Sequence, residues 1–101
     1  MSLLEALEAA SAELGPVERA RDGAGGAEWR RGGRPFAVAT GDAAEFRLDP
    51  LVAAAALRTP DTSPSSRGPD WVRFAPAELD DYALDRAEAW LASGWRRAAS
   101  G

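Results

Sequence analysis

Residues 17–48 consist of short extended segments separated by turns that contain glycine, and this pattern constrains the fold of the chain more than any other. Gly32-Gly33 offers two adjacent positions that tolerate positive φ, which a two-residue β-hairpin turn requires. Gly23–Gly26 and Gly41-Asp42 are further turn signals. We therefore predict an antiparallel meander of three or four strands. The candidate segments are Val17–Asp22, Ala27–Arg31, Arg34–Thr40 and Ala44–Leu48.

Helices are predicted on either side of this meander. Ser2 and Glu5 form a capping-box pattern, and leucines at helical spacing follow, so the first helix is expected over about residues 3–14. Asp49-Pro50 combines a capping residue with a proline suited to the first helical position. This pair predicts a second helix over Leu51–Arg58.

A loop, one more strand and a closing helix complete the chain. Thr59–Pro69 is rich in Pro, Ser and Thr and is predicted to be an irregular surface loop. Trp71–Phe74 is predicted to be a strand, and Pro76 is expected to start the closing helix. The order helix, three or four strands, helix, strand, helix predicts one α+β domain over residues 1–101. Its antiparallel sheet of four to five strands is expected to form two layers with helices packed on one face.

The residue types argue against catalysis. The chain has no His, Lys or Cys, and general acid–base catalysis near neutral pH usually relies on His, Lys or a carboxylate with a shifted pKa. The serines of the 59–69 loop therefore have no His to activate them. Asp80, Asp81 and Asp85 are better explained as acids at a helix start, where the helix dipole favours negative charge. We expect no catalytic residue, no metal site and no cofactor, and hence no enzyme.

Composition also bears on origin and location. Basic residues are all Arg, Ala is abundant, and Lys, Asn and Ile are absent, which is typical of a GC-rich bacterial genome. The first residues lack the basic region of a signal peptide, and no apolar run approaches the roughly 20 residues that span a bilayer. A cytoplasmic protein without a membrane segment is therefore expected.

The arginines suggest a binding surface, although the formal net charge is −4. Three arginines flank the Gly32-Gly33 turn, so the hairpin is predicted to bring three guanidinium groups together beside a tryptophan. Arginine binds phosphate bidentately, and an aromatic ring can stack on an exposed base. Arg47 and Arg73 are expected to extend this patch on the sheet face opposite the core. The predicted contact residues for DNA or an acidic protein partner are Trp29, Arg30, Arg31, Arg34, Arg47 and Arg73.

Other interpretations use the same residues. The negative net charge favours arginines that pair with acids such as Glu28 or Glu45 and only keep the surface hydrated. Trp29 and Trp71 are more typical of a core than of a ligand groove, and Trp95 is the aromatic best placed for a dimer contact. The alternative function is therefore a protein-interaction module, or a homodimer that pairs its basic hairpin with the acidic last helix of a neighbour.

Four short motifs resemble the YjbR/MmcQ-like family. They are Gly32-Gly33-Arg34-Pro35-Phe36-Ala37, Phe46-Arg47-Leu48-Asp49-Pro50, Gly68-Pro69-Asp70-Trp71-Val72 and, in the last helix, Ser93-Gly94-Trp95. Together they extend over roughly residues 27–98, with Arg34 and Arg47 where the family usually has Lys. The resemblance implies a compact two-layer α/β fold. The description of that family as "double wing" DNA-binding proteins further implies binding to DNA.

Overall fold

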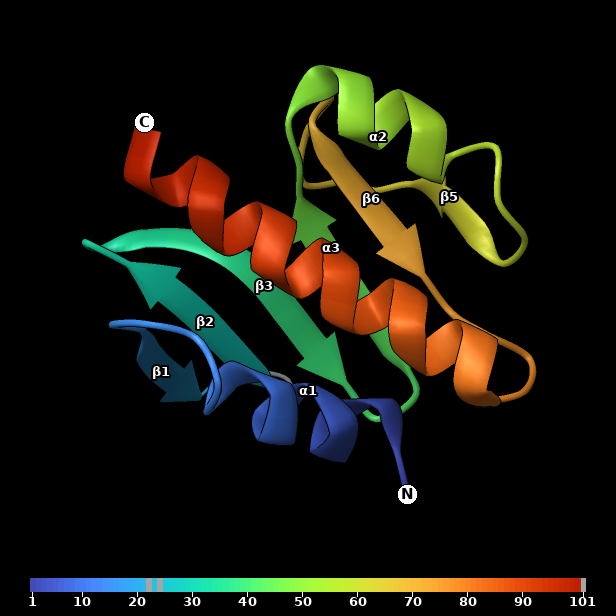
Figure 1. The fold of residues 1–101 in the computed structure, drawn as a ribbon, viewed down its shortest axis with the longest axis horizontal. Helices are drawn as coiled ribbons and strands as arrows, with labels where there is room; N and C mark the ends of the chain where they lie inside the picture. The colour runs from blue at the N-terminus through green and yellow to red at the C-terminus, as the bar shows by residue number, and fades with distance from the viewer. Residues whose placement is uncertain (22, 24, 101) are drawn as a thin grey trace.

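The structure is a computed structural model that describes residues 1–21, 23 and 25–100. Asp22 and Ala24, which the sequence pattern places in the first strand and its turn, lie outside the described residues. Three helices and six strands are described (Figure 1). In chain order they are α1 (Leu3–Ser11), β1 (Glu18–Arg21), β2 (Ala27–Arg31), β3 (Arg34–Thr40), β4 (Ala43–Arg47), α2 (Pro50–Ala56), β5 (Thr62–Pro64), β6 (Trp71–Phe74) and α3 (Asp81–Ser100). The predicted α+β class is confirmed.

All described strands belong to one antiparallel sheet, in the order β1-β2-β3-β4-β6-β5. The bounds of β2, β3 and β6 are those predicted, and β4 is shifted by one residue. Gly32 and Gly33 have φ angles of 60° and 78°, so the predicted two-residue hairpin turn is confirmed. The predicted meander therefore forms the larger part of the sheet.

The predicted strand count of four to five was wrong, because the 59–69 loop contains β5. Thr62 and Pro64 lie opposite Phe74 and Val72 of β6, at the edge of the sheet. A proline is tolerated there because an edge strand leaves one side of its backbone unpaired. The composition of this segment is that of a loop, and only the pairing with β6 makes it a strand.

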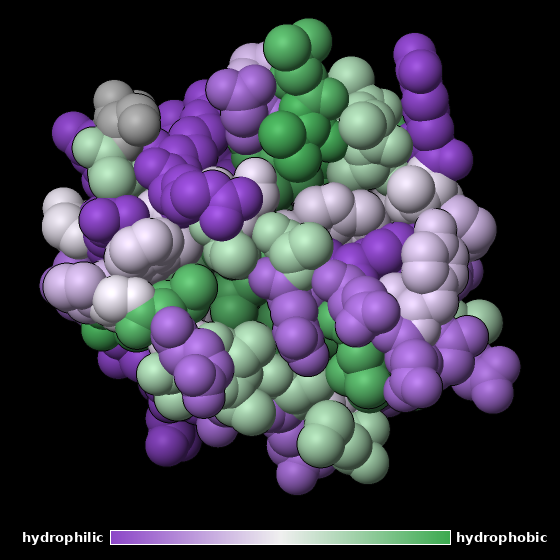
Figure 2. All heavy atoms as spheres, viewed as in Figure 1, coloured by the Kyte–Doolittle hydropathy of each residue, from purple (hydrophilic) through white to green (hydrophobic). Residues whose placement is uncertain are grey.

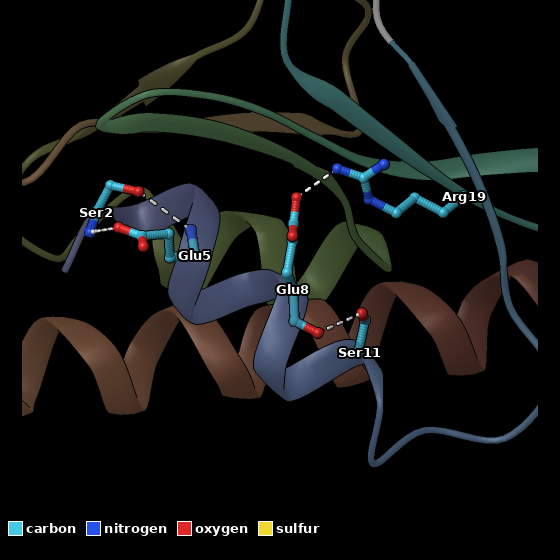
Figure 3. Close-up of polar contacts among 5 residues, drawn as sticks. All are labelled: Ser2, Glu5, Glu8, Ser11 and Arg19. Carbon is cyan, nitrogen blue, oxygen red and sulfur yellow. Dashed lines mark hydrogen bonds and ion pairs between the residues drawn. The ribbon is translucent and has the colours of Figure 1, made fainter.

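The helices cover one face of the sheet, as predicted (Figure 1). α1 and α3 lie side by side across β3 and β4, and α2 packs beside β6. Trp90 of α3 reaches into the core, where its ring centroid lies 6.0 Å from that of Phe46 and 5.1 Å from that of Phe74. Arg19 of β1 also pairs with Glu8 of α1, so an exposed ion pair joins the edge of the sheet to the helical layer (Figure 3). None of the described helices packs on the other face of the sheet, which we call the uncovered face.

α3 starts five residues later than predicted, at Asp81 instead of Pro76. The backbone N–H of Ala83 donates to the Oδ1 atom of Asp80 at 2.9 Å, so this carboxylate caps the helix. Proline fits the first position of a helix but cannot satisfy a free amide, whereas aspartate can. The chain therefore begins α3 after the aspartate.

α1 and α2 end earlier than predicted, at Ser11 and Ala56. Each ends in backbone hydrogen bonds between residues three apart, from Leu14 N–H to the Ser11 oxygen (3.2 Å) and from Thr59 N–H to the Ala56 oxygen (3.0 Å). Such bonds tighten the last turn and satisfy carbonyls that have no helical partner. The hydroxyls of Thr59 and Thr62 also donate to the Ala56 oxygen, which closes the end of α2.

Candidate functional site

The structure divides the three hairpin arginines between two faces of the sheet. On the uncovered face, the Arg30 guanidinium pairs with Glu28, two residues earlier in the same strand. On the helical side, Arg31 donates to the backbone oxygen of Trp95 at 3.1 Å and Arg34 donates to that of Ala98 at 3.2 Å. The expected cluster of guanidinium groups at the hairpin tip is therefore wrong, because neighbouring residues in a strand point to opposite faces.

Arg31 and Arg34 instead stabilise the C-terminal part of α3. The Arg31 guanidinium carbon lies 3.6 Å from the ring centroid of Trp95, which is a close cation–π contact. Cationic groups beside the C-terminal carbonyls also interact favourably with the helix dipole. Both arginines thus hold α3 against the hairpin.

The tryptophans near the hairpin are also occupied within the fold. Trp29 is fully buried in the core, so its ring cannot stack on a ligand at the surface. The indole N–H of Trp95 donates to the Pro16 oxygen at 2.9 Å, and a Cβ added at Gly15 would lie 2.7 Å from the Trp95 ring. Trp95 therefore packs against the turn after α1. Its indole N–H is used within the chain and is not free for the dimer contact that was expected at this residue.

The remaining predicted residues, Arg47 and Arg73, lie together on the uncovered face. Arg47 of β4 stands opposite Trp71 of β6, and Glu45 of β4 stands opposite Arg73 of β6. The two arginines are diagonal neighbours, a relation that places Cα atoms about 7–8 Å apart in antiparallel pairs. We call Arg47, Arg67, Trp71 and Arg73 the β4–β6 surface.

Glu45 binds the 65–67 segment and does not pair with Arg47 or Arg73. Its Oε1 atom accepts from the Arg67 Nε at 3.0 Å, and its Oε2 atom accepts from the hydroxyl of Ser65. The Arg67 backbone N–H donates to the same hydroxyl at 3.1 Å. Among the residues that the structure describes, neither Arg47 nor Arg73 forms an ion pair. Two guanidinium groups thus remain able to bind an anion from outside.

Arg67 and Trp71 complete the surface, and neither was among the predicted contact residues. The Arg67 guanidinium carbon lies 5.6 Å from the centroid of the partly buried Trp71 ring. A groove of about 200 Å³ runs beside it, lined by Val38, Thr40, Ala43, Glu45, Arg67 and Arg73. Sequence patterns could not place Arg67 here, because it lies in the segment predicted to be an irregular loop.

Two features are absent from the described residues. Within the described range, no three or more His, Cys, Asp or Glu side chains come together in a way that could hold a metal ion. No described helix is long and apolar enough to cross a membrane. Comparison with protein-family models, with curated proteins and with solved structures finds no match to this chain. The resemblance to the YjbR/MmcQ-like family therefore stays a prediction.

Proposed function

We propose that this domain is a binding module without catalytic activity that contacts single-stranded nucleic acid through the β4–β6 surface. The observation that carries the proposal is the pair Arg47 and Arg73, which have no acidic partner among the described residues although Glu45 shares their face. Glu45 is held by Ser65 and Arg67, so its carboxylate is not available to these two guanidinium groups. Phosphate oxygens match the donor geometry of arginine well.

A single strand suits this surface better than a duplex. Trp71 lies opposite Arg47 and two residues before Arg73, and its partly buried ring offers part of an indole face to an unstacked base. Base–aromatic stacking contributes about 1–3 kcal/mol per base. A protein with a formal net charge of −4 is poorly suited to coating a duplex, where many phosphates must be neutralised. A short site with two or three phosphate contacts is compatible with that charge.

Fluorescence anisotropy of a labelled single-stranded oligonucleotide at low salt tests the proposal. We expect Arg47→Ala and Arg73→Ala each to weaken binding about tenfold, the loss typical of a charge-assisted hydrogen bond. Each substitution should also lower the slope of log affinity against log salt by about 0.7, because one phosphate contact is lost. Trp71→Phe should retain part of the stacking energy.

Two variants serve as controls. Arg96→Ala removes an exposed arginine of α3 that forms no ion pair with a described residue, and it should leave affinity unchanged. Arg31→Ala should lower the melting temperature and leave affinity unchanged, because Arg31 contacts α3. Absence of binding at low salt, or an equal loss in Arg96→Ala and Arg47→Ala, would refute the proposal. Binding to polyglutamate but not to oligonucleotide would instead assign the surface to an acidic protein partner.

A further inference from the structure

α2 is a short helix with no polar side chain within its bounds. Its sequence is Pro-Leu-Val-Ala-Ala-Ala-Ala, and Leu57 follows as the C-terminal cap. A helix that is apolar all round is normally buried on all sides. α2 is instead buried on one side only, through Ala53 and Ala56.

The outer side of α2 is an exposed apolar stripe. Leu51 is 82% exposed, Ala54 and Ala55 are also exposed, and Arg58 follows at the same helical spacing. Leu57, which is 40% exposed, widens the stripe on one flank. Figure 2 shows apolar side chains gathered over α2 at the top of the molecule. Burial of a large apolar side chain such as Leu51 is favourable, because it removes apolar surface from water.

Opposite charges stand at the two ends of this stripe. The carboxylate of Asp49 caps the start of α2, where its Oδ1 atom accepts from the Leu51 N–H at 3.1 Å, and it remains exposed. Arg58, just beyond the other end, forms no hydrogen bond or ion pair through its side chain with any residue described. The apolar stripe therefore has an acidic residue just before it and a basic residue just after it.

Such a stripe is complementary in charge to an antiparallel second copy of itself. If two α2 helices pack antiparallel about a two-fold axis between Ala54 and Ala55, each Arg58 comes opposite Leu51 of the second copy and within one helical turn of its Asp49. Ala54 and Ala55 let the two backbones approach closely, and each Leu51 is covered by the other helix. We infer that the exposed face of α2 is the contact surface of a symmetric dimer of this chain.

The contact is expected to be weak. Seven helical residues extend only about 10 Å, and interfaces that bury less than about 1,200 Å² belong to weak or transient complexes. Sedimentation velocity from micromolar to millimolar protein should therefore show the mass rise from 10.7 kDa toward twice that value only at the upper end.

Substitutions on the exposed face can be made without disturbing the core. Ala54→Glu should weaken self-association at least tenfold, whereas Ala89→Glu, at an exposed alanine of α3, should not change it. Arg58→Glu should weaken it because two like charges then meet at each end, and Arg96→Glu is the matched control. Arg47→Ala, which tests the nucleic-acid surface, should leave self-association unchanged, so the two proposals can fail separately.

Cross-linking tests the symmetry itself. The chain has no cysteine, so Ala54→Cys introduces a unique thiol close to the expected two-fold axis. A short bis-maleimide should join two Ala54→Cys chains efficiently and two Ala89→Cys chains poorly. A wild-type protein that stays monomeric up to millimolar concentration would overturn the inference. So would equal cross-linking of the two cysteine variants, or loss of association in Ala54→Glu without cross-linking of Ala54→Cys, since α2 would then dock on a different surface.

Discussion

Glu5 closes the first turn of α1 by exchanging hydrogen bonds with Ser2 (Figure 3). The Ser2 N–H donates to Glu5 Oε1 at 2.8 Å, and the Glu5 N–H donates to the Ser2 hydroxyl at 3.1 Å. Hydrogen bonding with Ser2 lowers the pKa of Glu5 below its ordinary value of 4.5. The backbone of Ser2 has the largest effect and its side chain the second largest. Because the folded form has the lower pKa, Glu5 stabilises the fold above pH 4.5, and this contribution disappears as the pH falls through the folded value.

Glu5→Gln should reduce the loss of stability between neutral pH and pH values below 4.5, as measured by urea unfolding at a series of pH values. Glu13→Gln, which neutralises an exposed acid of the turn after α1, is the charge-matched control. If Glu5→Gln and the wild type lose stability in parallel on acidification, the Glu5 carboxylate does not contribute to the pH dependence of stability.

Gly94 allows α3 to approach the backbone of the central strands. A Cβ at this position would lie 3.1 Å from the Phe36 oxygen, 3.2 Å from the Arg47 oxygen and 3.3 Å from the Phe36 ring. Phe36 is itself turned toward α3, because β3 has one extra residue where its register with β2 shifts. Two of the three neighbours are backbone oxygens of central strands, which cannot move without disturbing the sheet.

We therefore expect Gly94→Ala to lower the free energy of unfolding by about 1 kcal/mol. The gain in helix propensity is about 1 kcal/mol, and overpacking of a tight contact costs about 1–3 kcal/mol. Urea denaturation measures the difference. Ala89→Gly on the exposed side of α3 should lose about 1 kcal/mol through propensity alone, which checks that the helix responds normally. A Gly94→Ala protein more stable than the wild type would contradict the tight contact inferred between α3 and the central strands.

At the scale of elements, the sequence predicts most of what depends on local pattern. Gly32-Gly33 is a local signal, and it specifies the turn of the β2–β3 hairpin. The register shift that turns Phe36 and Val38 to opposite faces of the sheet has no such signal. β5 could not be predicted, because Thr62–Pro64 is a strand only through its pairing with β6.

The candidate site shows the same division. The opposite orientation of Arg30 and Arg31 follows from strand alternation, so it could have been predicted from position alone. The contact of Arg31 with the Trp95 oxygen could not have been predicted in this way, because it joins residues far apart in the chain. Arg47 and Arg73 were placed correctly on one face. Arg67 reaches Trp71 because its segment is held there by Glu45 and by backbone hydrogen bonds on either side of it, from Ser65 N–H to the Trp71 oxygen and from Trp71 N–H to the Gly68 oxygen.

At the scale of the whole molecule, the two faces differ in charge. The helical side exposes Glu13, Asp81, Asp85 and Glu88, whereas the uncovered face presents Arg47 and Arg73 without acidic partners among the described residues. A formal net charge of −4 therefore does not exclude an anionic ligand, because the field near the uncovered face is set by its own groups. An approaching anion would be repelled from the helices and directed to the sheet.

Stability is also expected to vary across the sheet, because β3 is paired on both sides and covered by α1 and α3 whereas β1 and β5 are edges. Native-state hydrogen exchange should show β3 amides opening only with global unfolding, with a steep dependence on denaturant. Amides of β1 and β5 should exchange at least about a hundredfold faster, with little dependence on denaturant, because local fraying exposes them. β1 amides as protected as those of β3 in dilute protein would mean that another group covers this edge. β1 would then not be a free edge of the sheet, and a second molecule would be expected to pair with it.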